Sequence, residues 1–174
     1  MLFHFSEDPA ITVFEPRAVP GTRPAGREWL NEPLVWAIDE WHSPAYFFPR
    51  DCPRILWWPL PATTAEDVAR FVGTGAPRTV ACVEWAWFER LASTTLFRYS
   101  FETTAFVDIH DHGVHVSRTA AIPAAIAPID DLPAALRAAD VELRFMPSLP
   151  PLRDMWETTL HVSGIRLRNA EGWD

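Results

Sequence analysis

Short apolar stretches, separated by turns that contain proline and glycine, limit this chain to short secondary-structure elements. Residues 7–29 are predicted to be irregular, because their prolines and glycines prevent long regular elements. The apolar or alternating stretches predict strands at 2–6, 33–38, 54–59, 78–87, 94–101, 141–147 and 163–169, and weaker patterns of the same kind lie at 113–118 and 125–129. These patterns predict an α+β fold with a curved, mostly antiparallel sheet of about seven or eight short strands and about three or four short helices.

The clearest helix is predicted over residues 63–72. Thr63 and Glu66 have the spacing of a capping box, and acidic residues fill the first turn. Gly73 follows the last apolar residue, where a glycine commonly ends a helix. The local sequence therefore indicates both ends of this helix.

The other predicted helices are short. The segment 130–140 reads as a capped helix with Pro133 in its first turn. In 42–48, Ser43 would be the N-cap and the following proline the first helical residue. A further short helical segment is predicted at 88–92, directly after a buried strand.

Length and composition restrict the class of protein. A chain of 174 residues is long enough for one domain with a real core and short for two, so a single domain over residues 1–174 is predicted. The sequence lacks an apolar run of about 18 residues and a signal segment at its start, so we expect a soluble, cytoplasmic protein that does not enter membranes. Cys52 and Cys82 lie outside disulfide and zinc spacings and are predicted to be reduced core residues.

The charges narrow the function further. A net charge of −8 argues against a nucleic-acid partner, because attraction to phosphate backbones needs clustered cations. All 15 basic residues are arginines, which excludes P-loop, Schiff-base and lysine-base chemistry. Arginine does suit bidentate binding of phosphate or carboxylate, so a small nucleotide ligand stays possible. The oligomeric state is left open by these features.

A histidine-rich run is the first candidate site. Its potential metal ligands are Asp108, His110, Asp111, His112 and His115. On a strand the first two histidines would share a face while the third points away, and Gly113 would interrupt the element. We interpret the run as a solvated turn and expect no bound metal, and a divalent-metal hydrolase site is the alternative.

The aromatic segment 34–59 is the second candidate site, since it holds four of the nine tryptophans. Trp36, Trp57 and Trp58 are predicted to be core residues, and residues 46–54 are predicted to form a ligand wall. There Tyr46 and Phe47 would stack on a heterocycle, and Arg50 would bind phosphate. In the first strand, His4 lies between two phenylalanines and points to the opposite face from both, where it could donate or accept a hydrogen bond.

The strings HFSEDP (4–9), WHSPAYFFPRDCPR (41–54) and SGIRLRNA (163–170) resemble an uncharacterised bacterial family of unknown function, over nearly the whole chain. More remotely, the order of LFHFSED and PAYFFPRDCPRIL resembles the start of the ADP-ribosyltransferase-like fold, notably its DNA-modifying toxin group. The second resemblance implies NAD as the cofactor. It also implies that His4 holds the nicotinamide end, that Tyr46 or Phe47 flanks it, and that Arg50 contacts the NAD and helps to position the acceptor.

The same resemblance implies loss of nicotinamide through an oxocarbenium-like state that a carboxylate stabilises. Glu84 and Glu102 are the candidate catalytic carboxylates, because they lie in or beside strands downstream of the aromatic segment. The first hypothesis is therefore an NAD-using transferase or glycohydrolase. The second is a noncatalytic ligand-binding or structural domain, in which the aromatic segment is core and the arginines lie on the surface.

Overall fold

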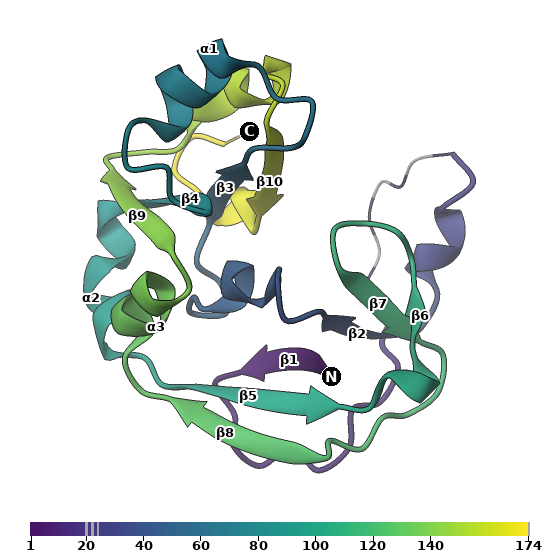
Figure 1. The fold of residues 1–174 in the computed structure, drawn as a ribbon. Coiled ribbons are helices and arrows are strands. Elements are labelled where there is room, and N and C mark those ends of the chain that lie inside the picture. Colours follow the sequence, from purple (N-terminus) through teal and green to yellow (C-terminus); the bar gives the residue numbers. More distant parts are fainter. Residues whose placement is uncertain (20, 22, 24, 174) are drawn as a thin grey trace. The chain divides into compact units, whose positions relative to one another are not determined.

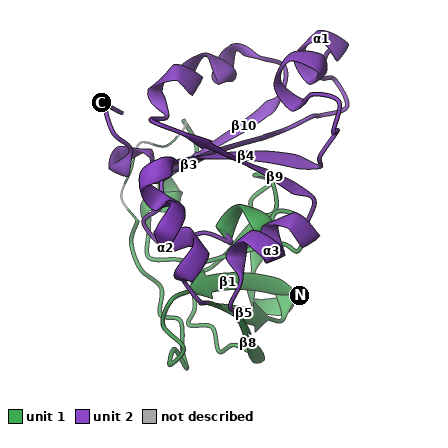
Figure 2. Ribbon diagram, turned by 90° about the vertical axis from the view of Figure 1, so that its left-hand side faces the viewer, with its two compact units in different colours: residues 1–46, 96–129 green, residues 47–95, 130–174 purple. Residues whose placement is uncertain are grey.

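The structure is a computed structural model that describes residues 1–19, 21, 23 and 25–173. The chain divides into two compact units (Figure 2). Unit 1 comprises Met1–Tyr46 and Leu96–Ile129, and unit 2 comprises Phe47–Thr95 and Asp130–Asp174. Each unit is thus assembled from two separate stretches of sequence and has its own sheet.

Unit 1 is built on a six-stranded sheet with the order β6-β7-β2-β1-β5-β8, in which every neighbouring pair is antiparallel (Figure 1). Its strands are β1 (Leu2–Ser6), β2 (Val35–Ile38), β5 (Leu96–Phe101), β6 (Val107–Asp108), β7 (Val114–Ser117) and β8 (Ala125–Ile129). The 3-10 helices that the structure describes in this unit are η1 (Glu28–Asn31), η2 (Ser43–Tyr46) and η5 (Thr103–Ala105).

The irregular arm that follows β1 packs on one face of this sheet. Phe14 contributes its ring to the buried cluster there, with ring centroids 5.0 Å from Tyr99 and 5.2 Å from Phe101. The Tyr99 hydroxyl donates to the carbonyl of Asp8 and accepts from the N–H of Ile11, at 3.2 Å. A buried tyrosine therefore satisfies its polar end by holding the arm against the sheet.

Unit 2 is built on a four-stranded sheet with the order β10-β3-β4-β9, in which β4 and β9 are parallel and the other neighbours antiparallel. Its strands are β3 (Arg54–Trp58), β4 (Thr79–Glu84), β9 (Val141–Met146) and β10 (His161–Ile165). Its helices are α1 (Ala65–Asp67), which continues into a π-helical turn η3 (Val68–Val72), then η4 (Trp85–Trp87), α2 (Phe88–Ser93), α3 (Leu132–Ala138), η6 (Pro150–Glu157) and η7 (Leu167–Asn169).

The core of unit 2 centres on β3 and β4, whose residues are all buried. Ile55, Trp57 and Val80 lie in this cluster, and the indole N–H of Trp57 donates to the carbonyl of Phe71 at 3.1 Å. Trp57 and Trp58 are core residues, as predicted. Burial of both faces explains why the central residues of these strands are apolar without alternation, while Arg54, Thr79 and Glu84 lie at the strand ends.

The α+β class and the short elements are confirmed. The ten strands of the described residues form two sheets, whereas the sequence pattern predicted about seven or eight strands in one curved sheet. No helix among the described residues has the length and apolar character needed to span a membrane.

Two predicted caps differ from the structure. The N-cap of α1 is Thr64, whose Oγ1 accepts from the N–H of Asp67 at 3.2 Å, so the predicted capping box at Thr63 is shifted by one residue. The Thr63 hydroxyl instead donates to the carbonyl of Thr159 at 2.9 Å. Ser43 also does not act as the predicted N-cap, because its hydroxyl donates to a carbonyl, described below.

The predicted strand 163–169 ends early. β10 stops at Ile165, because Arg166 adopts a left-handed conformation with φ of 57°, which an extended strand cannot contain. Residues Leu167–Asn169 then form η7. The alternation of apolar and polar residues predicts a longer strand, but the left-handed conformation of Arg166 ends it.

Candidate functional site

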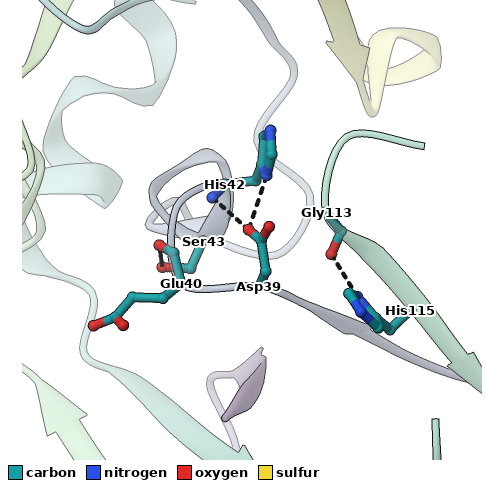
Figure 3. Close-up of polar contacts among 6 residues, drawn as sticks. All are labelled: Asp39, Glu40, His42, Ser43, Gly113 and His115. Carbon is teal, nitrogen blue, oxygen red and sulfur yellow. Dashed lines mark hydrogen bonds and ion pairs between the residues drawn. The ribbon is translucent and has the colours of Figure 1, made fainter. Parts of the chain in front are cut away.

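Asp39 and His42 form a half-buried, hydrogen-bonded pair in unit 1, in the turn that follows β2 (Figure 3). One carboxylate oxygen, Asp39 Oδ1, accepts from the backbone N–H of His42 at 2.7 Å and from its ring Nδ1 at 2.8 Å. A carboxylate oxygen only accepts, so Nδ1 carries the hydrogen. In the neutral ring Nε2 is therefore the nitrogen that accepts a proton.

Gly113, in the loop before β7, packs against both Asp39 and His42. Its carbonyl accepts from the backbone N–H of Asp39 at 2.9 Å. The same carbonyl accepts from His115 Nδ1 at 3.0 Å (Figure 3). Its φ is +78°, and a Cβ at this position would overlap His42 Nδ1 and lie 2.5 Å from Asp39 Oδ1. The turn after β2 and the loop before β7 thus fit together only with glycine at position 113.

The rings of Trp41 and His112 lie beside the His42 ring. The Trp41 ring packs edge-on against it with centroids 4.5 Å apart, and the His112 ring lies 6.1 Å away. Trp41 is 43% exposed, whereas the His42 side chain is 18% exposed. The site therefore combines an oriented imidazole with a flat, accessible ring beside it.

Ser43 is not arranged as a nucleophile, although it follows His42 in the chain. Its hydroxyl donates to the carbonyl of Glu40 at 3.0 Å, and the residue is buried (Figure 3). An oriented imidazole can take a proton from a water or a hydroxyl that comes within hydrogen-bond reach.

Neither thiol of the described chain is set up as a nucleophile. Cys52 and Cys82 are both free and buried in unit 2, as the sequence predicted. Burial raises the pKa of Cys52 from its ordinary value of 9.0 to about 12, and burial raises the pKa of Cys82 to about 11. The reactive thiolate is therefore scarce in the folded state.

We expect both thiols of the native protein to resist Ellman's reagent near neutral pH, and both to react once guanidinium unfolds the chain. Since the unfolded thiols ionise at their ordinary pKa, the free energy of unfolding should fall as the pH rises above 9.0. Rapid labelling of either cysteine in the native protein would contradict this assignment. The measurement is absorbance of the released thiolate during reaction with and without denaturant.

His4 and Tyr46, two of the predicted ligand residues, belong to unit 1. His4 Nδ1 donates to the carbonyl of Trp36 at 2.9 Å, because a carbonyl only accepts, and its ring lies 4.8 Å from that of Phe14. The Tyr46 ring is parallel to that of Phe5, with centroids 6.4 Å apart. Because His4 and Phe5 are consecutive in β1, their side chains leave the sheet on opposite faces, so Tyr46 packs on the face away from His4.

Phe47 and Arg50, the other predicted ligand residues, belong to unit 2. Phe47 is buried and Arg50 is exposed. The carbonyl of Arg50 accepts from Arg166 Nε at 3.3 Å, and Asn169 Nδ2 donates to the carbonyl of Asp51 at 2.8 Å. Arg166 and Asn169, near the C-terminal end of the chain, thus hold the backbone of residues 50–51. Convergence of His4 and Arg50 in one cleft stays a prediction.

The two candidate carboxylates have different surroundings. Glu84 ends β4 and is 3% exposed, and its Oε1 accepts from the backbone N–H of Glu171 at 2.9 Å. Glu102 is exposed and directly precedes η5 in unit 1. Glu102 therefore lies in the same unit as His42, and Glu84 fixes the C-terminal segment of unit 2.

The histidine-rich run forms a turn between β6 and β7. Asp108 Oδ1 accepts from the backbone N–H of His110 at 2.7 Å, and this hydrogen bond lowers the pKa of the Asp108 carboxyl. His110 and His112 adopt left-handed conformations, with φ of 54° and 43°. Within the described residues, no three or more histidine, cysteine, aspartate or glutamate side chains are grouped so that they could hold a metal ion.

A separate hollow of about 260 Å³ lies in unit 1, lined by Trp29, Ala105, Val107, Val116, Ser117, Arg118 and Thr119. Its polar groups already have partners. Arg118 Nε donates to Glu32 at 3.3 Å, and the Ser117 hydroxyl donates to the carbonyl of Thr119 at 3.0 Å. The hollow therefore offers no group for acid or base chemistry.

Sequence reasoning missed the pair of Asp39 and His42. The signal was an aspartate directly after a predicted strand and a histidine three residues later, a spacing at which one turn brings carboxylate and ring together. The contribution of Gly113 could not be found this way, because it approaches the turn from more than seventy residues along the chain.

Comparison with known proteins identifies the family. A family model described as "Family of unknown function (DUF6886)" matches residues 3–170, and the chain belongs to this family. No curated protein and no solved structure matches the chain. The resemblance to an uncharacterised family is thus confirmed, and the function has to be argued from the residues.

Proposed function

We propose that this family member is an NAD-using transferase or glycohydrolase in which His42 is the general base. The observation that carries the proposal is the contact of Asp39 Oδ1 with both the backbone N–H and the ring Nδ1 of His42, at 2.7 and 2.8 Å. A carboxylate that holds an imidazole in one tautomer and one orientation prepares Nε2 to take a proton from an attacking oxygen. Asp39 is thereby a positioning residue.

NAD is proposed as the substrate because of the remote resemblance of the first strand and the aromatic segment to the ADP-ribosyltransferase-like fold. His4 supports this proposal, since its Nδ1 is held by the carbonyl of Trp36 and its Nε2 suits the amide N–H of nicotinamide. Trp41 supplies an exposed ring for stacking beside His42. The resemblance also assigns Tyr46 or Phe47 to the nicotinamide and Arg50 to the NAD, but Tyr46 packs on Phe5, whose side chain leaves β1 on the face opposite to His4.

The proposed reaction needs no redox step. An oxygen of water or of an acceptor hydroxyl forms a bond to C1′ of the nicotinamide ribose, and the bond from C1′ to the ring nitrogen breaks. The electron pair of that bond goes to the nitrogen, and nicotinamide leaves neutral. The proton of the attacking oxygen goes to His42 Nε2. Glu102, which belongs to the same unit as His42, is the proposed carboxylate that stabilises the positive charge on the ribose.

The test is incubation of the full chain with NAD and chromatography for released nicotinamide, beside a thermal-shift titration. A ligand at ten times its dissociation constant adds about 1.4 kcal/mol to stability, which is a shift of a few degrees for a chain of this size. We expect a saturable rise and nicotinamide release above the rate in buffer. If NAD neither shifts the melting temperature nor loses nicotinamide, the proposed function is wrong.

A noncatalytic binding or structural role is the second candidate, and a specific observation favours it. Phe47 is buried, and Tyr46 packs on Phe5, so part of the predicted ligand wall also serves as packing. Under this alternative the protein would bind NAD without releasing nicotinamide, or would not bind it. The same titration and assay therefore separate the two candidates.

A further inference from the structure

Arg98, in β5 of unit 1, is a cation without a hydrogen-bond or ion-pair partner among the described residues. Its guanidinium lies over the Phe3 ring, 5.2 Å from the centroid. Its Nε is buried and donates to no described acceptor. A buried donor without an acceptor costs free energy, which an acceptor oxygen of a bound anion would recover.

The strand register places an aromatic wall beside this cation. Arg98 pairs with Phe5 on β1 and with Ala127 on β8, so these three side chains leave the sheet on the same face. Ala127 contributes only a methyl group to this face. The Phe5 ring lies parallel to that of Tyr46, with an interplanar angle of 5°. We name this surface, formed by Phe3, Phe5, Tyr46, Arg98 and Ala127, the Arg98 face.

We propose that the Arg98 face binds a flat aromatic or heterocyclic molecule that carries a phosphate or carboxylate, and that Arg98 holds the anionic group. A planar guanidinium matches both anions with parallel hydrogen bonds, and it binds them more strongly where water is scarce. The rings of the face offer stacking surface to the flat part of the ligand. This inference uses neither Asp39 nor His42, and Tyr46 is the one residue that it shares with the proposed function.

The test is isothermal titration calorimetry of the full chain with four probes: AMP, adenosine, benzoate and inorganic phosphate. AMP carries a ring and a phosphate, benzoate a ring and a carboxylate, and the other two lack one of these parts. We expect AMP or benzoate to bind at least about tenfold more tightly than adenosine and inorganic phosphate, because a charge-assisted hydrogen bond and stacking then act together. Which of the two binds identifies the anion.

Arg98→Gln is expected to weaken that binding by about tenfold or more. Arg118→Gln is the matched control, because Arg118 belongs to the same unit, stacks on Trp29 and has an acceptor in Glu32. The control should bind as the wild type does.

Two results would overturn the inference. One is the absence of binding of both AMP and benzoate at millimolar concentration. The other is wild-type affinity in Arg98→Gln. If that variant does not fold, Arg98→Lys decides, since it keeps the charge and loses the planar fork. Folded Arg98→Lys with intermediate affinity supports the inference, and unchanged affinity in it contradicts the need for a guanidinium.

Discussion

Gly113→Ala is expected to lower the free energy of unfolding by about 2–4 kcal/mol and to separate Asp39 from His42. The backbone at Gly113 has φ of +78°, where any Cβ is strained. The new methyl group would also overlap His42 Nδ1 and lie 2.5 Å from Asp39 Oδ1. Urea unfolding measures the loss of stability. The NMR signal of the hydrogen-bonded His42 Nδ1 proton, expected in the wild type, should disappear.

Gly26→Ala is the matched control for this change. Gly26 also belongs to unit 1 and has φ of +81°, but nothing lies within 4 Å of an added Cβ. The free energy of unfolding of this variant should fall by only about 1–2 kcal/mol, the cost of the left-handed backbone, and the His42 proton signal should remain. If the free energy of unfolding fell equally in both variants, the close contact of Gly113 with Asp39 and His42 would contribute nothing to stability.

Much of the local structure was predictable from the sequence, because short-range patterns determine it. The alternating residues of β1 and β5 and the apolar run of β3 gave the strands at the predicted places. Asp131 caps α3 by accepting from the N–H of Ala134 at 2.8 Å, as the capped-helix pattern indicated. Local sequence is sufficient where one turn or one strand decides the conformation.

The assignment of strands to sheets was not predictable in this way. β4 pairs in parallel with β9, which is more than fifty residues further along the chain, while β5 pairs with β1. Such pairings depend on contacts between distant segments, and periodicity is silent on them. The sequence therefore predicted the strands and the α+β class without the division into two sheets.

In the candidate site, too, the local contact was predictable from the sequence and the long-range contact was not. The order of Asp39 and His42 in one turn is a local signal, and it could have been found. The closing contact from Gly113 depends on how the loop before β7 packs against the turn after β2. The histidine-rich run contains residue types that bind metals, and its backbone instead places Gly113 against His42.

His42→Gln is expected to reduce the rate of nicotinamide release by about 10²–10⁴-fold, the usual contribution of a general base. Glutamine keeps a donor that can reach Asp39, so the fold should be preserved, but it has no nitrogen that takes up a proton at neutral pH. The affinity for NAD should change little, because the base acts on the attacking oxygen. The measurement is kcat and KM from chromatography of released nicotinamide, with circular dichroism as the check on folding.

His110→Gln is the control for this variant, since His110 is 87% exposed and contacts Asp108 rather than the pair. It should keep the wild-type rate. Asp39→Asn should lose activity as well, because an amide no longer fixes the ring tautomer, although the reacting proton never passes through Asp39. If His42→Gln lost only affinity at unchanged kcat, His42 would be a binding residue. The Asp39 and His42 pair would then orient a ligand contact instead of a base.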